Sequence, residues 1–210
     1  MKGAIFDIDG TILDSMTIFH KITETFFAGY GKTFTPELEK MINDMRIEDS
    51  VPYLLKLWNL DIKEETVFEY VKAEFQNKYK TEIMPKPYVC DYIKGLKKKG
   101  IKIAAATSGY YELCSHALRR AGILDCIDAF AFSHEVNCSK SNPDVYLLAA
   151  ERIGVDPKDC IVYEDILIGI EGAKKGGFKT CAVYDETNVQ DTKSLKDTAD
   201  MYITSWQELM

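Results

Sequence analysis

Short apolar runs that end in polar residues alternate with helix-like segments along most of this chain of 210 residues. The runs span residues 3–8, 102–107, 129–133, 161–165 and 180–184, and helices are predicted at 89–99, 111–121, 143–153 and 169–175. Strands that alternate with helices pair in parallel, so the pattern predicts an α/β fold. Ligands of such sheets bind outside the carboxyl ends of the strands. Polar residues at those ends are therefore the candidate functional groups.

One segment interrupts the alternation. Amphipathic stretches follow one another at 18–27, 36–45, 51–58 and 64–79, with no strand predicted between them. Pro85 and Pro87 discourage helix continuation and mark the return to the alternating pattern. We expect a helical-bundle cap domain at residues 15–81, inserted into a core domain made of residues 1–14 and 82–210.

Composition and charge restrict the class of protein. Hydrophobic residues make up 46% and charged residues 28% of the chain, a mixture typical of folded domains. The formal net charge of −7 disfavours nucleic acids and anionic membrane surfaces as partners. The six cysteines stand singly without zinc-ligand spacing, and no apolar stretch is long enough to span a membrane. We expect free thiols and a cytoplasmic protein.

The most specific motif follows the first predicted strand, in the sequence FDIDGT at residues 6–11. It places Asp7 and Asp9 two residues apart at the end of a buried strand, with a turn at Gly10. A carboxylate can act as a nucleophile in phosphoryl transfer, because it divides hydrolysis into formation and breakdown of an acyl phosphate. The motif therefore predicts a nucleophile and a second carboxylate that exchanges protons.

The motif resembles the first signature of the haloacid dehalogenase superfamily, in its phosphatase and phosphomutase branch. Thr107 at the end of KIAAAT resembles the second signature, Lys140 in KSNPDVYLLAAERIGV the third, and Glu164-Asp165 in IVYEDILIGIEGAKKGG the fourth. Their order and spacing agree with the family over nearly the whole chain. The resemblance implies a Rossmann-like parallel sheet with an inserted helical cap.

The resemblance also implies roles for these residues. Asp7 would be the nucleophile and Asp9 the general acid and base. The phosphate would be held by Thr107, its neighbour Ser108 and Lys140. A Mg²⁺ ion, which prefers oxygen ligands, would bind the Asp7 carboxylate, the backbone carbonyl of Asp9 and Asp165, with Glu164 nearby. Taken singly, each residue also has an ordinary role as a turn, a helix cap or a solvated side chain.

One position near the predicted metal site departs from the family pattern. Ile166 stands where related enzymes often carry a hydroxyl residue, which removes one hydrogen bond near the metal site. Arg46 resembles, with an offset of one residue, an arginine that holds the second phosphate in sugar-phosphate mutases. Its alternative role is that of a solvated loop arginine. Substrate selection is expected to depend on the cap, which can close over the site.

The leading hypothesis is a magnesium-dependent phosphatase that hydrolyses a small phosphomonoester, such as a sugar phosphate. A phosphomutase of the beta-phosphoglucomutase type would use the same site, with a sugar hydroxyl in place of water. A binding or regulatory protein on the same fold is the third alternative, and retention of Asp7 and Asp9 disfavours it. Asp9 and Asp165 disfavour dehalogenation, which requires neither a metal nor a proton donor of this kind.

Overall fold

The computed structural model describes residues 1–43 and 47–210. Contacts between Cα atoms divide the chain into two compact units, Met1–Ser15 with Ile83–Met210 and Met16–Glu82. The first unit contains a six-stranded parallel sheet with the strand order β3-β2-β1-β4-β5-β6. Its strands are β1 (Gly3–Phe6), β2 (Lys102–Thr107), β3 (Ala129–Phe132), β4 (Cys160–Glu164), β5 (Lys179–Val183) and β6 (Met201–Ile203). The predicted α/β fold is confirmed.

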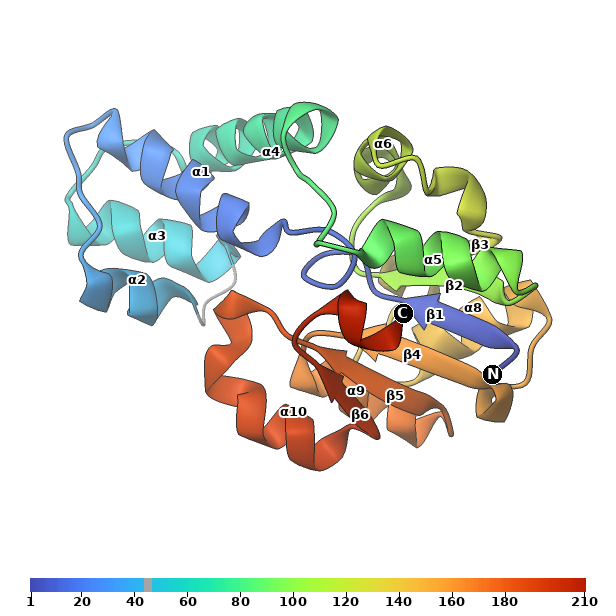
Figure 1. The fold of residues 1–210 in the computed structure, drawn as a ribbon. Coiled ribbons are helices and arrows are strands. Elements are labelled where there is room, and N and C mark those ends of the chain that lie inside the picture. Colours follow the sequence, from blue (N-terminus) through green and yellow to red (C-terminus); the bar gives the residue numbers. More distant parts are fainter. Residues whose placement is uncertain (44–46) are drawn as a thin grey trace. The chain divides into compact units, whose positions relative to one another are not determined.

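Helices and 3₁₀ turns connect the strands of this unit (Figure 1). The α-helices are α5 (Val89–Lys98), α6 (Tyr111–Arg120), α7 (Ser133–Val136), α8 (Asp144–Ile153), α9 (Leu167–Lys175) and α10 (Thr192–Thr198). The 3₁₀ helices are η1 (Leu124–Cys126), η2 (Pro157–Asp159), η3 (Glu186–Asp191) and η4 (Trp206–Leu209). Each strand is parallel to its neighbours, so the carboxyl ends of all six strands lie at one edge of the sheet.

Every residue of β1 is buried, and successive side chains of a strand point to opposite faces, so both faces of the sheet are covered at β1. Ile5 of β1 belongs to a core cluster with Tyr146 and Ala149 of α8. The next residue, Phe6, stacks on Tyr163 of β4 with ring centroids 4.6 Å apart, within a group of aromatic rings from α5 and η4. Side chains buried on both faces account for the nearly uninterrupted apolar runs of these strands.

The second unit is helical, with α1 (Met16–Ala28), α2 (Pro36–Asn43), α3 (Ile47–Leu57) and α4 (Glu64–Thr81). Its own core holds aromatic and aliphatic side chains, among them Phe27, whose ring lies 5.1 Å from that of Trp58. The segments on either side of the insertion pair with each other: the Asp14 N–H donates to the carbonyl of Met84 at 2.9 Å, and the Lys86 N–H donates to that of Ile12 at 2.8 Å.

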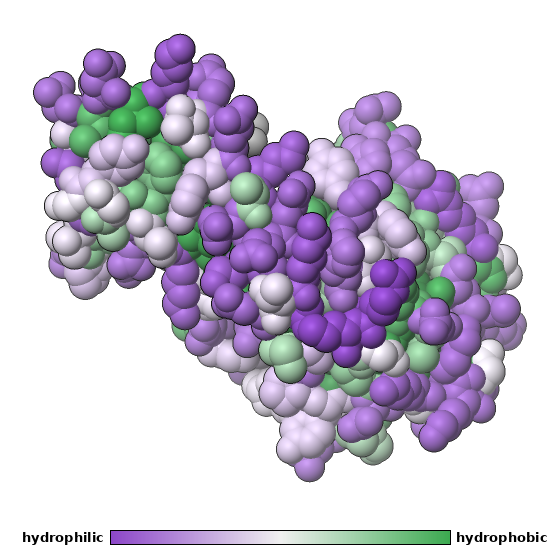
Figure 2. All heavy atoms as spheres, turned by 90° about the horizontal axis from the view of Figure 1, so that it is seen from above, coloured by the Kyte–Doolittle hydropathy of each residue, from purple (hydrophilic) through white to green (hydrophobic). Residues whose placement is uncertain are grey.

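The surface agrees with the composition. Figure 2 shows a face on which hydrophilic side chains predominate. All six cysteines lie among the described residues and are free. Within those residues, no helix combines the length and the apolar character needed to cross a membrane.

Candidate active site

Four candidate residues lie at or just beyond the carboxyl ends of three adjacent strands. Asp7 follows β1, Thr107 is the last residue of β2, Glu164 is the last residue of β4, and Asp165 follows it. The sheet continues one residue past β1, because the Asp7 N–H donates to the carbonyl of Tyr163 at 2.9 Å. The order β2-β1-β4 therefore brings these side chains to one part of the sheet edge.

Three carboxylates form a buried cluster at this edge. One carboxylate oxygen each of Asp7, Glu164 and Asp165 lies within 4.8 Å of the others. The three residues are 4%, 0% and 1% exposed. Lys140, which precedes α8 and is itself 4% exposed, forms ion pairs with both Asp7 and Glu164. One buried ammonium group therefore links the end of β1 with the end of β4.

Glu164 is held by four hydrogen bonds. Its Oε1 accepts from Lys140 Nζ at 2.6 Å and from the Tyr146 hydroxyl at 3.0 Å. Its Oε2 accepts from the backbone N–H groups of Asp165 at 2.8 Å and Ile166 at 3.1 Å. A carboxylate offers about four acceptor positions, so these donors fill the capacity of Glu164. Glu164 is thereby suited to orient Lys140.

The charges of the cluster do not balance. Three carboxylates and one ammonium group leave an excess of two negative charges if all are ionised. Burial raises the pKa of Asp7 well above its usual value, although the ammonium of Lys140 acts in the opposite direction. Burial, followed by the charge of Glu164, raises the pKa of Asp165 to about 7. A divalent cation with oxygen ligands fits both the charge and the donor atoms of the cluster.

Asp9 lies in the loop after β1 and is only partly buried. Its Oδ1 accepts a hydrogen bond from the Ser15 hydroxyl at 2.7 Å. Its Oδ2 faces Gly109, where an added Cβ would lie 3.5 Å from this oxygen and 3.4 Å from Thr107 Oγ1. Asp9 and Thr107 therefore approach the same turn, at the exits of β1 and β2. Asp9 is not part of the carboxylate cluster, and metal binding through its carbonyl stays a prediction.

Two glycines permit close approaches in the site. Gly10 has a φ of +83°, and an added Cβ would collide with the carboxylate of Asp165. Gly172 of α9 lies against the backbone carbonyl of Lys140, where an added Cβ would collide with the oxygen. Glycine at these positions allows the first loop to approach Asp165 and helix α9 to approach the segment that carries Lys140.

Ser108 and Arg46 complete the set of predicted substrate-binding residues. Ser108 is exposed, and its hydroxyl shares a hydrogen bond of 3.1 Å with that of Ser133. Arg46 lies outside the described residues. The roles of Ser108 and Arg46 in substrate binding stay predictions.

Three side chains in contact with the cluster were not predicted. Thr11 Oγ1 donates to Asp165 Oδ1 at 2.8 Å, and Asn188 Nδ2 donates to Asp165 Oδ2 at 2.9 Å. Tyr146 donates to Glu164. Thr11 is the last residue of the FDIDGT motif, so its place near the site was predictable, but its hydrogen bond to Asp165 was not. Tyr146 and Asn188 lie 18 and 23 residues from their partners and carry no local signal.

The comparisons with known proteins agree with this geometry. A family model described as haloacid dehalogenase-like hydrolase matches residues 1–177. A phosphorylated carbohydrates phosphatase of Thermotoga maritima is 26% identical over 211 residues, which cover 100% of this chain and 97% of the relative. Hexitol phosphatase B of Escherichia coli is 25% identical over 212 residues, with coverages of 99% and 93%. The solved structure of a candidate beta-phosphoglucomutase from Thermotoga maritima superposes with a TM-score of 0.86 at 27% identity, with coverages of 97% and 94%.

Proposed function

Since the chain belongs to the haloacid dehalogenase-like hydrolase family, in the branch of its phosphatases and beta-phosphoglucomutases, we propose that it hydrolyses a small phosphomonoester, such as a sugar phosphate, through Asp7. The observation that carries this proposal is the ion pair between Lys140 and Asp7 inside the buried carboxylate cluster. In this ion pair, the proposed nucleophile contacts the cation that would bind the phosphoryl oxygens.

In the first step, an Asp7 carboxylate oxygen attacks phosphorus and the bond to the ester oxygen breaks. Asp9 donates a proton to the departing oxygen, which leaves as an alcohol. In the second step, Asp9 removes a proton from water, the water oxygen attacks phosphorus, and the bond to Asp7 breaks. The products are the alcohol and inorganic phosphate, and both carboxyl groups return to their starting states. Ser15 supports these steps by donating a hydrogen bond to Asp9 Oδ1, which orients the carboxylate that exchanges the proton.

Lys140 would hold the oxygens of the transferring phosphoryl group, together with Thr107 at the end of β2. Burial lowers the pKa of Lys140, but the carboxylates of Asp7 and Glu164 outweigh burial and raise the pKa overall. Lys140 is therefore protonated in the substrate-free protein. The cation is fixed before the substrate arrives, because both Asp7 and Glu164 bind it.

Mg²⁺ would be held by the carboxylates of Asp7 and Asp165 and by the backbone carbonyl of Asp9, with Glu164 beside it. When bound, it would neutralise negative charge on the cluster and on the phosphate. Thr11 and Asn188 donate one hydrogen bond to each oxygen of Asp165. Since a carboxylate offers about four acceptor positions, Asp165 retains capacity to bind a metal ion. Oxygen ligands without sulfur or imidazole suit magnesium.

The names of the relatives support phosphorylated sugars and sugar alcohols as the substrate class. The test measures phosphate release from a panel of these compounds and of other phosphomonoesters, with Mg²⁺ and with EDTA. Mg²⁺-dependent release is expected for the wild-type protein. Asp7→Asn should abolish it without unfolding the chain, and Asp9→Asn should slow it strongly. Turnover by Asp7→Asn at the wild-type rate would contradict the mechanism.

The similarity to the candidate beta-phosphoglucomutase makes phosphoryl transfer to a sugar hydroxyl the second candidate reaction. The same protein samples are assayed for hexose-phosphate isomerisation. Isomerisation with little phosphate release would favour the mutase over the phosphatase. Absence of both activities would favour a binding protein.

A further inference from the structure

Each carboxylate oxygen of Asp165 accepts a hydrogen bond from a different part of the chain, one before Asp165 and one after it. Thr11 of the first loop donates to Oδ1 at 2.8 Å. Asn188 Nδ2 donates to Oδ2 at 2.9 Å and also approaches the backbone carbonyl of Asp165 at 3.4 Å. Both donors are neutral, so they fix the direction of the carboxylate without cancelling its charge. Ile166, the next residue, has no side-chain donor for this purpose.

The local backbone directs Asn188 toward Asp165. Asn188 lies in η3 with φ −111° and ψ 23°, values that depart from helical geometry. The turn before it is fixed by Asp185, whose Oδ1 accepts from the Thr187 N–H at 2.9 Å and the Thr187 hydroxyl at 2.5 Å. The Asn188 N–H donates to the carbonyl of Asp185 at 3.1 Å. Asp185 thus defines the start of the segment that presents Asn188.

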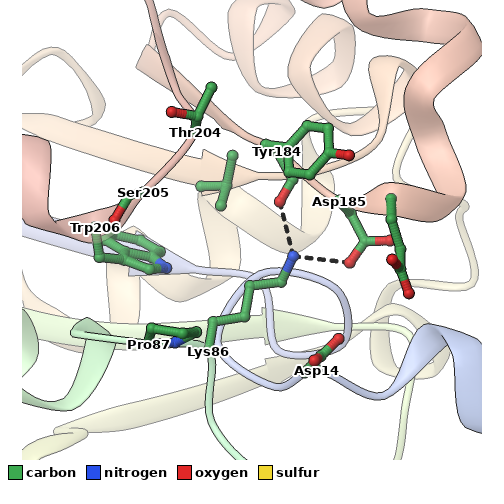
Figure 3. A pocket seen from close by; sticks show the side chains of 10 residues that line it. Asp14, Lys86, Pro87, Tyr184, Asp185, Thr204, Ser205 and Trp206 are labelled. Carbon is green, nitrogen blue, oxygen red and sulfur yellow. Dashed lines mark hydrogen bonds and ion pairs between the residues drawn. The ribbon is translucent and has the colours of Figure 1, made fainter.

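Lys86 in turn anchors Asp185, as Figure 3 shows. Its Nζ donates to the backbone carbonyl of Tyr184 and to Asp185 Oδ2, both at 2.7 Å. The side chains of Lys86 and Asp185 are 12% and 1% exposed, so this ion pair is largely shielded from solvent. The bonds run from Lys86 through Asp185 to the turn that carries Asn188, which ties the position of Asn188 to the end of β5.

We propose that Asn188 is a positioning residue for Asp165 as a Mg²⁺ ligand, through the hydrogen bond that it donates to Asp165 Oδ2. The inference rests on the proposed function, because it concerns the metal of the same site. Without Asn188, Oδ2 loses its donor and the Asp165 side chain gains rotational freedom. Ordering it again on metal binding then costs free energy. Loss of a group that orients a metal ligand typically weakens metal binding roughly 10- to 100-fold.

The test is isothermal titration calorimetry of Mg²⁺ into the metal-free protein, with wild type, Asn188→Ala and Gln190→Ala. Gln190 is exposed in the same 3₁₀ segment and serves as the matched control. We expect the Mg²⁺ dissociation constant to rise roughly 10- to 100-fold for Asn188→Ala and to stay at the wild-type value for Gln190→Ala. Asn188→Asp should bind Mg²⁺ no better than wild type, because its carboxylate removes the donor to Asp165.

Two further measurements separate positioning from loss of structure. The denaturation midpoint of Asn188→Ala in EDTA should stay close to that of wild type. In phosphate-release assays, the Mg²⁺ concentration for half-maximal rate should rise, while saturating Mg²⁺ restores most of kcat and leaves KM for the substrate unchanged. A fall in kcat that excess Mg²⁺ does not restore would overturn the proposed role.

Equal Mg²⁺ affinities of wild type and Asn188→Ala would also overturn the inference and would leave the phosphatase proposal intact. Conversely, if no phosphomonoester is hydrolysed but Asn188→Ala binds Mg²⁺ more weakly, the proposed reaction fails and the positioning role stands. Calorimetry needs no substrate, so the two failures are distinguishable.

Discussion

Lys140 and Glu164 form an ion pair of 2.6 Å in which the two side chains are 4% and 0% exposed. The pair is not isolated, because Lys140 also contacts Asp7 and Glu164 receives three further hydrogen bonds. Side chains and backbone groups of the protein therefore take the place of water around this ammonium group. A cation fixed in this way needs little rearrangement when a phosphoryl group moves past it.

Replacement of Lys140 is expected to lower both stability and activity. Lys140→Ala leaves the carboxylates of Asp7 and Glu164 buried without their cation, and loss of one partner of a buried pair typically costs about 3–5 kcal/mol. We expect a decrease of this order in the free energy of unfolding, measured by urea denaturation in EDTA at pH 7.5. Phosphate release should fall to near background at saturating Mg²⁺, because the proposed mechanism assigns the binding of the phosphoryl oxygens to Lys140.

Lys158→Ala is the control for this experiment. Lys158 pairs with Asp156 at 2.9 Å, with side chains that are 76% and 52% exposed. Exposed ion pairs contribute little to stability, so stability should change little and activity not at all. A loss of stability for Lys140→Ala as small as that for Lys158→Ala would show that the buried carboxylates do not depend on Lys140.

Mg²⁺ should stabilise the folded protein, and Asp165→Asn should diminish this effect. A ligand at 100 times its dissociation constant adds about 2.7 kcal/mol to the free energy of unfolding. The neutral amide of the variant is a weaker ligand than the carboxylate, so its gain at the same Mg²⁺ concentration should be smaller. Thermal denaturation with Mg²⁺ and with EDTA measures the difference.

Asp197→Asn, at an exposed position in α10, is the control and should keep the wild-type gain in stability. An undiminished gain for Asp165→Asn would place the bound metal elsewhere.

Much of the sheet was predictable because its strands are buried on both faces. Five runs predicted β1 to β5 to within a few residues. The first run was predicted to reach residue 8, whereas β1 ends at Phe6, because Ile8 already accepts the N–H groups of Ile12 and Leu13 in the following loop. β6 was not predicted, since Met201–Ile203 has three residues and too short a pattern to recognise.

Some contacts within the site were also predictable from the sequence, and others were not. Asp7, Glu164 and Asp165 lie at strand ends, so the order of a parallel sheet is sufficient to bring them together. Asn188 and Tyr146 reach the cluster from a 3₁₀ turn and from the first half of α8. Their contacts depend on how those elements pack, which no spacing in the sequence encodes.

Gly10→Ala is expected to impair both folding and the metal site. The substitution meets two separate penalties: a φ of +83°, which alanine adopts with strain, and the carboxylate of Asp165 at the position of the new Cβ. Gly100→Ala isolates the first penalty, because Gly100 has a φ of +75° with nothing within 4 Å of an added Cβ. We expect a loss of roughly 1 kcal/mol for Gly100→Ala from urea denaturation and a clearly larger loss for Gly10→Ala. Equal losses would mean that the loop moves away from Asp165 without cost.

The stability of the edge of the sheet should depend on the charge of Glu135. Its two carboxylate oxygens accept from Arg152 at 2.9 and 2.7 Å, and Oε2 also accepts from the Phe132 N–H at 2.9 Å. The hydrogen bonds from Arg152, opposed in part by desolvation, lower the pKa of Glu135 to about 2. A carboxyl group whose pKa is lower in the folded state stabilises the protein above its unfolded pKa. This contribution is lost as the pH falls from about 4.5 toward 2.

Glu135→Gln removes the charge at every pH and therefore removes this dependence. Wild type should be more stable than the variant at pH 6, and the difference should shrink progressively as the pH is lowered below 4.5. Urea denaturation of both proteins between pH 6 and the lowest pH at which they remain folded measures the difference. Glu151→Gln, at an exposed position of the same helix as Arg152, is the control and should track wild type more closely. A difference that stays constant or grows with acidification would mean that the pair with Arg152 does not favour the ionised form of Glu135.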